Sequence, residues 1–273
     1  MDPKLITPIT YYGGKKGLLH HILPLVPDHE VYTETFFGGG ALFFAKEPCK
    51  NETINDKMDL LINFYRVLKN DFDKLHKLVD QTLYSRTQYN KALSFLRKGS
   101  KATPIQKAWA FFFQVNCGFA KKFQSAIAYS NTQSVSKQHS FYNLKSRFTR
   151  ELQNRIEKVF IENTDALKVL RSRNVPNAFH YQDPPYPGAD QGHYKGYGWD
   201  QYQNLLEFNQ NECKGKFLLS NYHSPLLQEY VDRNGWNIKL IKHRITAPKT
   251  KNRDKIEVLV WNYNNTTSQP KLF

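Results

Sequence analysis

Short segments rich in β-branched and aromatic residues alternate with helical segments over most of this chain. The expected strands span residues 31–37, 52–55, 159–162, 178–182, 216–219, 236–245 and 255–263. The expected helices span residues 16–25, 41–46, 59–68, 144–158, 166–171, 202–209 and 225–232. Because strands that alternate with helices form a mostly parallel sheet covered on both faces, we predict a doubly wound α/β fold. The last two strands alternate with period two, which predicts an antiparallel pair at one edge of the sheet.

The alternation is lost between residues 71 and 143, where lysines, arginines and glutamines mix with aromatic residues. Near residues 125–140 the chain becomes rich in serine, glutamine and asparagine, as a loop would be. A chain of 273 residues is long enough for one domain with a sizeable insert. We therefore predict a domain formed by residues 1–70 and 144–273, and an inserted, mainly helical subdomain at residues 71–143.

The chain is strongly basic, with 39 lysines and arginines against 24 aspartates and glutamates and a net charge of +15. This excess favours a polyanionic partner such as nucleic acid, because phosphate neutralisation supplies most sequence-independent affinity. The alternative is a basic protein that binds no nucleic acid. Cys49, Cys117 and Cys213 are too far apart for a zinc motif, so no metal site is predicted. No apolar run has the length of a signal peptide or a membrane span, so we expect an intracellular, cytoplasmic protein.

Three consecutive glycines, Gly38 to Gly40, follow the first expected strand and precede a helix. Glycines at such a turn let the backbone approach a ligand closely. Asp56 ends the next strand, where a carboxylate can accept hydrogen bonds from ribose hydroxyls. The spacing differs from the dinucleotide pattern GxGxxG, so it favours a nucleoside cofactor without a pyrophosphate. The alternative is a glycine-rich turn beside an aspartate, with no ligand.

The sequence Asp183-Pro184-Pro185-Tyr186 comes directly after the strand expected at residues 178–182. A carboxylate and a proline carbonyl offer two acceptors to a planar amino group, and a tyrosine offers a flat face to its ring. Two acceptors that hold the hydrogens of an exocyclic amine favour a nitrogen with a localised lone pair, which can attack a sulfonium methyl group. These four residues are therefore predicted to be catalytic. The alternative is an ordinary proline turn.

Other segments point less directly to a ligand. Lys15 follows two glycines just before a helix, where it can meet a carboxylate or a phosphate, although an exposed lysine is the commoner arrangement. Asp165 ends a strand and can either contact a cofactor or cap the next helix. Residues 193–199 mix glycine with aromatic residues and are predicted to form a flap over the target ring. The basic residues at 249–255 predict either contacts with DNA phosphates or a solvated loop.

Four motifs occur in one order: Tyr-Tyr-Gly-Gly-Lys (11–15), Glu-Thr-Phe-Phe-Gly-Gly-Gly-Ala (34–41), Asn-Asp (55–56) and Asp-Pro-Pro-Tyr (183–186). Together they resemble the Dam-like (D12) class of DNA adenine-N6 methyltransferases, over nearly the whole chain outside the insert. Residues 116–119, with an asparagine, a glycine and an aromatic, also resemble a short pattern of that family. Tyr11 stands where the family usually has tryptophan, and the family's glycine motif usually includes a different or bulkier residue. Both departures keep the flat ring and the backbone access that cofactor binding requires.

The resemblance implies a Rossmann-like methyltransferase fold, S-adenosylmethionine as the cofactor, and methyl transfer to a flipped-out adenine in double-stranded DNA. It also implies that the insert recognises the target sequence. The implied cofactor-binding residues are Tyr11, Lys15, Glu34, Phe36, Gly38, Gly40, Asp56, Asp165 and Asp183. The expected DNA-binding residues are Arg86, Lys98, Asn116, Lys121, Lys122, Lys249, Lys251 and Arg253. A bacterial or phage protein associated with the nucleoid is expected, with a restriction endonuclease as a candidate partner.

Four alternatives remain open. The methylated amine could belong to cytosine, at N4, or to adenine in RNA. Cytosine enzymes more often have serine before Pro-Pro-Tyr, so Asp183 favours adenine. A non-catalytic DNA-binding module of the same fold is the third alternative, which the presence of Lys15, Asp56 and Asp183 disfavours. A nucleotide-binding dehydrogenase is the fourth, and its glycine fingerprint is missing.

Overall fold

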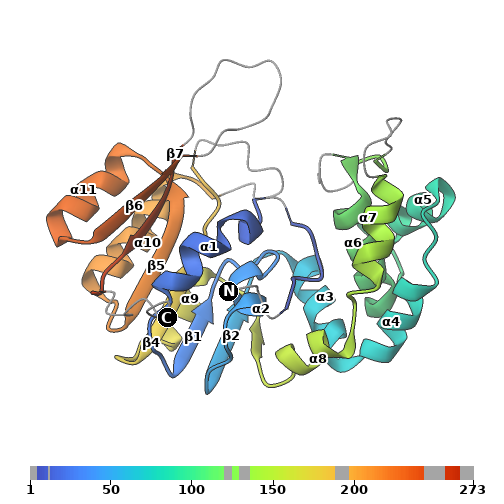
Figure 1. Cartoon of the computed structure of the whole chain (residues 1–273), viewed down its shortest axis with the longest axis horizontal. Coiled ribbons are helices and arrows are strands. Elements are labelled where there is room, and N and C mark those ends of the chain that lie inside the picture. Colours follow the sequence, from blue (N-terminus) through green and yellow to red (C-terminus); the bar gives the residue numbers. More distant parts are fainter. Residues whose placement is uncertain are drawn as a thin grey trace, which may run out of the picture. The chain divides into compact units, whose positions relative to one another are not determined.

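The computed structural model describes residues 5–11, 13–119, 125–128, 136–187, 197–242 and 256–264 (Figure 1). These residues divide into two compact units. The first unit lies within Met1–Leu19, Phe37–Pro48 and Ile54–Thr164, and the second within His20–Phe36, Cys49–Thr53 and Asp165–Phe273. Each unit therefore combines segments that are far apart in the sequence.

Seven strands form one sheet in the described residues, in the order β3-β2-β1-β4-β5-β7-β6. The strands are β1 (Val31–Glu34), β2 (Asn51–Asn55), β3 (Phe160–Glu162), β4 (Ala178–Gln182), β5 (Lys216–Tyr222), β6 (Asn237–Lys242) and β7 (Ile256–Trp261). Strands β1, β4 and β5 run parallel, and β7 is antiparallel to both β5 and β6. Strands β2 and β3 lie beyond β1 on one side of the sheet, and β5, β7 and β6 lie beyond β4 on the other side. The predicted doubly wound sheet with an antiparallel C-terminal edge is therefore confirmed.

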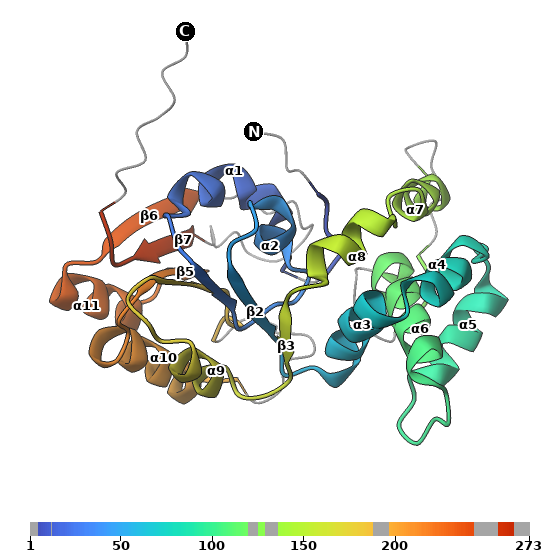
Figure 2. The ribbon, with the colours of Figure 1, turned by 90° about the horizontal axis from the view of Figure 1, so that it is seen from below.

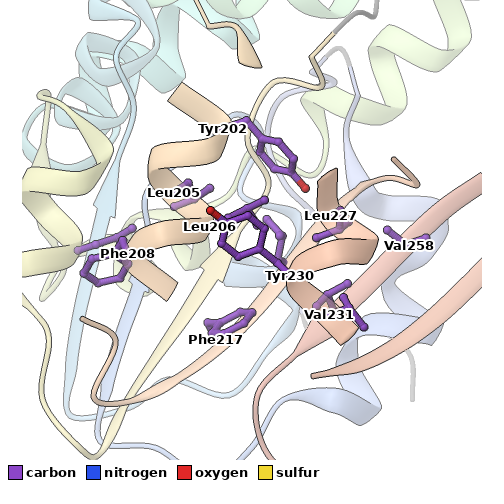
Figure 3. Close-up of a cluster of buried hydrophobic side chains, with 12 residues drawn as sticks. Tyr202, Leu205, Leu206, Phe208, Phe217, Leu227, Tyr230, Val231 and Val258 are labelled. Atoms are coloured by element: carbon purple, nitrogen blue, oxygen red, sulfur yellow. The ribbon is translucent and has the colours of Figure 1, made fainter. Parts of the chain in front are cut away.

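Three helices of the second unit cover one face of its strands (Figure 2). They are α9 (Ala166–Ser172), α10 (Trp199–Asn211) and α11 (Pro225–Asn234). Between helices and strands lies a cluster of buried apolar side chains, drawn in Figure 3. Tyr202 and Leu206 of α10 meet Phe217 of β5 and Val258 of β7 in this cluster. Burial of these side chains fixes the strand register, since a slip of one residue would turn them to the other face.

The opposite face of these strands is covered by the chain that leads into β1. That chain includes α1 (Leu19–Ile22) and the short 3-10 helix η2 (Leu23–Leu25). The Tyr263 hydroxyl donates a hydrogen bond to the Leu25 carbonyl, and the His29 ring lies 5.2 Å from the ring of Phe179. Both faces are covered, so β4 carries buried residues along its whole length, as an interior parallel strand requires.

The first unit is mainly helical. Its helices are η1 (Lys15–Leu18), α2 (Ala41–Ala45), α3 (Asp59–Asn70), α4 (Phe72–Asp80), α5 (Arg86–Phe95), α6 (Pro104–Cys117), α7 (Lys137–Lys145) and α8 (Arg150–Ile156). Helix α6 packs against α3, α4, α5 and α7, and its residues Phe111, Phe112 and Phe113 are all fully buried. A helix that is apolar on every side is expected at the centre of such a group. The helical character predicted for residues 71–143 therefore holds in the described residues, and the boundaries of the subdomain stay a prediction.

Two expected elements differ from the structure. The single helix expected at residues 144–158 is wrong, because α7 ends at Lys145 and α8 begins at Arg150. Phe148 lies in the turn between them and is buried, with its ring stacked 5.8 Å from that of Phe72. Packing of this ring among the helices stabilises the turn. The strand expected at residues 31–37 ends at Glu34, where the chain turns toward the glycine loop. In the described residues, no helix is long and apolar enough to cross a membrane.

Candidate active site

The ends of two central strands lie next to each other in the second unit. Strands β1 and β4 are parallel neighbours, and Glu34 at the end of β1 is paired in register with Tyr181. Asp183 follows the last residue of β4. The sheet extends in opposite directions from these two strands. In open α/β sheets, ligands bind outside the carboxyl ends of the strands at such a point.

The structure brings Asp183 and Tyr186 together. The Tyr186 hydroxyl lies 3.3 Å from Asp183 Oδ1, 3.2 Å from Ser220 Oγ and 2.5 Å from Glu257 Oε1. The ring of Tyr186 meets the ring of Tyr222 edge to face, with centroids 4.4 Å apart. Pro184 is buried, and Pro185 is half-buried like Asp183 and Tyr186. The predicted catalytic segment is thus a packed turn whose carboxylate and phenol are close to each other.

Carboxylates and tyrosines gather at this end of the sheet. Burial raises the pKa of Tyr186 well above its usual value, and Asp183 and Glu257 raise it further. Burial also raises the pKa of Tyr32, whose hydroxyl donates to Glu34 Oε2 at 2.7 Å. Both phenols therefore keep their protons at neutral pH and act as hydrogen-bond donors.

The glycine loop in the first unit has an unusual backbone. Gly38 and Gly40 have φ angles of +47° and +63°, in the region that favours glycine. The Gly40 amide donates to the Phe37 carbonyl at 2.7 Å, which closes the turn into α2. The Tyr65 hydroxyl donates to the Gly38 carbonyl at 3.2 Å. The predicted tight turn before a helix is therefore present.

Asp56 fixes this loop, a role that the sequence did not reveal. It is only 1% exposed, and its Oδ2 accepts a hydrogen bond from the Gly38 amide at 3.0 Å. Its Oδ1 accepts from the Met58 amide at 2.9 Å. The Tyr11 hydroxyl donates to the sulfur of Met58 at 3.2 Å, and the Tyr11 ring packs against Gly38 and Gly39. Two of the motifs quoted above are thus joined to the glycine loop by direct contacts.

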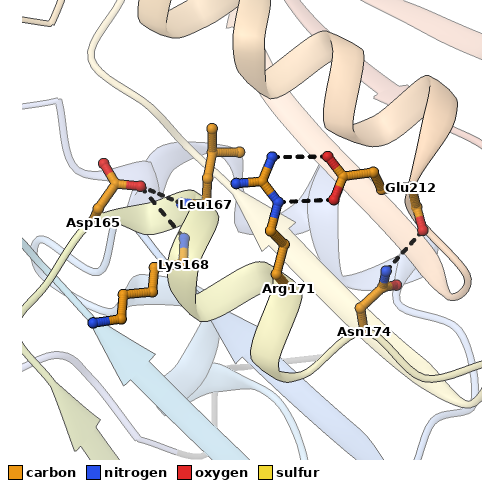
Figure 4. Close-up of polar contacts among 6 residues, drawn as sticks. All are labelled: Asp165, Leu167, Lys168, Arg171, Asn174 and Glu212. Atoms are coloured by element: carbon orange, nitrogen blue, oxygen red, sulfur yellow. Dashed lines mark hydrogen bonds and ion pairs between the residues drawn. The ribbon is translucent and has the colours of Figure 1, made fainter.

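The remaining predicted cofactor residues are distributed over both units. In the first, Lys15 is buried and its Nζ donates to the Gly13 carbonyl at 3.1 Å. In the second, the Phe36 ring meets the Tyr197 ring edge to face at 5.6 Å. Asp165 caps α9, because its Oδ1 accepts from the Leu167 and Lys168 amides at 3.0 and 3.4 Å (Figure 4). The capping role expected as one alternative is confirmed, and a cofactor contact stays a prediction.

The predicted DNA-binding residues have different environments. Arg86 begins α5 and Lys98 follows its end, and both are exposed. Asn116 on α6 is occupied within the protein, since its Oδ1 accepts from the Thr10 amide at 2.8 Å. Its Nδ2 donates to the Phe112 carbonyl at 2.9 Å and to the Pro8 carbonyl at 3.4 Å. Lys121, Lys122, Lys249, Lys251 and Arg253 lie outside the described residues, as does most of the expected flap.

Glu257 is the residue of this site that the sequence did not single out. It stands 71 positions from its partner Tyr186, so no local pattern links the two. Only the pairing of β7 with β5 brings them together. Among the residues that the structure describes, no group of three or more histidine, cysteine, aspartate or glutamate side chains could hold a metal ion.

The sequence is similar to known DNA-modifying enzymes. A chain from Lactococcus lactis subsp. cremoris named type II methyltransferase M1.LlaDCHI is 30% identical over 275 residues, covering 93% of this chain and 94% of that one. Modification methylase StsI of Streptococcus sanguinis is 24% identical over 286 residues, covering 96% of this chain but 43% of the methylase. An rRNA methylase structure from Streptococcus thermophilus aligns over 92% of this chain and 98% of its own, with 11% identity and a TM-score of 0.36. That likeness is too weak to bear on function.

The family comparison agrees with the motifs. The family described as D12 class N6 adenine-specific DNA methyltransferase matches residues 11–247, which include the glycine loop, Asp56 and the Asp183–Tyr186 segment. The match extends over most of the chain, as does that to the Lactococcus protein. The chain therefore belongs to the D12 class of N6 adenine-specific DNA methyltransferases.

Proposed function

We propose that Asp183, Pro184 and Tyr186 hold the adenine that this methyltransferase modifies, after the base has rotated out of double-stranded DNA. One observation carries the proposal: the Asp183 carboxylate and the Tyr186 phenol lie together just past the end of β4. This strand neighbours β1 at the point where the direction of sheet growth reverses. A planar base can lie against the tyrosine while its amino group meets the carboxylate.

The chemistry follows from how the amine is held. The lone pair of the adenine amino group is conjugated into the ring, which makes it a poor nucleophile. Hydrogen bonds from the amine to the Asp183 carboxylate and a proline carbonyl favour a nitrogen with a localised lone pair. S-adenosylmethionine, when bound, would supply an electrophilic sulfonium methyl group. The amine nitrogen held by Asp183 and the proline carbonyl would be the nucleophile that accepts this methyl group, and the amine would lose one proton to solvent.

The family implies S-adenosylmethionine as the methyl donor, and the glycine loop fits a nucleoside of this kind. The positive φ angles of Gly38 and Gly40 let the chain turn sharply into α2, as a glycine loop around a ligand requires. A carboxylate oxygen can accept more than one hydrogen bond. Asp56 can therefore bind a ribose hydroxyl while it holds Gly38, and Glu34, Phe36, Lys15 and Tyr11 are the further residues we assign to the cofactor.

The basic residues of the helical subdomain are proposed to contact DNA. Arg86 and Lys98 are exposed near the two ends of α5, where they can reach phosphates. Residues 71–143 are proposed to recognise the target sequence. A restriction endonuclease of the same specificity is the proposed partner, as the word modification in the name of the Streptococcus sanguinis relative suggests for that protein.

The decisive variant is Asp183→Ala. We expect it to abolish methyl transfer, with weakened but measurable S-adenosylmethionine binding in calorimetry and nearly unchanged DNA binding in gel shifts. Asp200→Ala is the matched control, because Asp200 is an exposed aspartate at the start of α10. Single-molecule sequencing of DNA from cells that express the protein would report the methylated base and its context. Wild-type turnover by Asp183→Ala would refute the proposed role of this residue.

A further inference from the structure

The Tyr186 hydroxyl has one proton and three neighbouring oxygens. The distances are 2.5 Å to Glu257 Oε1, 3.2 Å to Ser220 Oγ and 3.3 Å to Asp183 Oδ1. A charged acceptor at the shortest distance makes the strongest hydrogen bond, so the proton is directed to Glu257. The Ser220 hydroxyl also donates to Glu257 Oε1, at 3.1 Å. Glu257 Oε1 is thus an acceptor within hydrogen-bond distance of both hydroxyls.

The sheet holds Glu257 in this place. Strand β7 pairs antiparallel with β5, and Glu257 is in register with Tyr222. The Tyr222 ring is the one that meets Tyr186 edge to face at 4.4 Å. Ser220 lies on β5 two residues before Tyr222 and is fully buried. The direction of the Tyr186 proton is therefore set by strand register, which a flexible surface contact would not achieve.

We propose that Glu257 is a positioning residue, which accepts the hydrogen bond of the Tyr186 hydroxyl and so directs that hydroxyl away from the Asp183 carboxylate proposed to bind the adenine amine. This inference rests on the role proposed above for Asp183. Without Glu257, the remaining carboxylate beside the hydroxyl is Asp183, at 3.3 Å. The phenol would then donate to Asp183 and compete with the amine for it. Burial and the neighbouring carboxylates raise the pKa of Tyr186, so the phenol keeps the proton that would compete.

The test is the rescue of one substitution by a second substitution in the same chain. Methyl transfer from labelled S-adenosylmethionine to unmethylated genomic DNA gives kcat and KM. Glu257→Leu is expected to lower kcat about tenfold with little change in KM for DNA, since one competing hydrogen bond is worth about 1.4 kcal/mol. Tyr186→Phe removes the competing proton, so the double variant should recover most of the loss and approach the rate of Tyr186→Phe alone. Because removing both partners of a buried hydrogen bond can also restore stability, urea unfolding of the same variants is measured, and kcat is compared at a temperature at which every variant is fully folded.

Two further variants keep the test decisive. Glu257→Gln keeps an acceptor oxygen, but an uncharged and weaker one, so we expect kcat to fall a few fold. Tyr186→Phe should again relieve this loss. The Glu257→Gln variant replaces Glu257→Leu in the test if the latter does not fold. Ser220→Ala leaves the Tyr186–Glu257 bond in place and should cost less than Glu257→Leu. A double variant as slow as the Glu257 variant alone would overturn the inference. If the double variant is that slow while Asp183→Ala is inactive in the same assay, the role of Glu257 is refuted and the proposed function stands. An active Asp183→Ala would refute both the role of Glu257 and the proposed role of Asp183.

Discussion

Gly40 and Gly235 share a backbone conformation but not their surroundings. Their φ angles are +63° and +61°. A Cβ at Gly40 would lie 2.4 Å from Cζ of Phe37, whereas a Cβ at Gly235 would meet nothing within 4 Å. An alanine in this left-handed conformation costs about 1–2 kcal/mol relative to glycine. Gly235→Ala should therefore show the conformational cost alone, and Gly40→Ala the same cost with a steric clash added.

The clash at Gly40 has no easy relief. Phe37 is 2% exposed, and its ring lies 4.7 Å from that of Tyr65 and 5.5 Å from that of Phe43. Overpacking of a filled core costs about 1–3 kcal/mol, because neighbouring side chains must leave their preferred rotamers. The expected total for Gly40→Ala is therefore about 2–5 kcal/mol, against about 1–2 kcal/mol for Gly235→Ala.

Urea unfolding of both variants measures this difference, and calorimetry with S-adenosylmethionine measures its effect on the loop. We expect Gly40→Ala to lower stability more than Gly235→Ala, and to be the variant of the two that weakens cofactor binding. Phe37→Leu removes Cζ, so its combination with Gly40→Ala should cost less than the sum of the single changes. Equal destabilisation by the two alanines would refute the reasoning, since it would mean that Phe37 moves aside freely.

Three further changes test polar groups elsewhere in the protein. Burial lowers the pKa of His180 from 6.5 to about 4. As the pH falls from 6.5 toward 4, His180 therefore takes up a proton in the unfolded chain but stays neutral in the folded protein. Stability should drop by about 2 kcal/mol from this group between pH 6.5 and 5, and His180→Leu should lack that drop in urea titrations at several pH values. Gln182 and Asn209 exchange two hydrogen bonds of 2.8 Å in the core, so Gln182→Leu should cost about 1–3 kcal/mol and Asn209→Leu should restore part of it in the double variant. Asn116→Ala releases the backbone of residues 8–10, and calorimetry and gel shifts should show weaker cofactor binding with little loss of DNA affinity.

The sequence allowed the sheet and its motifs to be predicted because these depend on local patterns. Strand β4 is rich in aromatic residues and is followed at once by the Asp183 carboxylate, and Gly38–Gly40 come shortly after β1. The function of a side chain was harder to predict where its partner is distant in the chain. Asn116 bonds to Thr10 over 106 positions, and Glu257 bonds to Tyr186 over 71. The helix break near Phe148 was missed for the same reason, because only packing against rings from other helices favours the turn.

The distribution of charge separates the two substrates of the proposed reaction. Burial raises the pKa of Tyr181, and Asp183, Glu34 and Glu257 raise it further, so three carboxylates act on one buried phenol. Such a group of like charges repels phosphates and attracts a cation such as the sulfonium of the methyl donor. The chain nevertheless carries a net charge of +15, and its exposed lysines and arginines attract DNA. Because salt screens exposed charges more than buried ones, rising ionic strength should weaken the hold on DNA well before that on the cofactor.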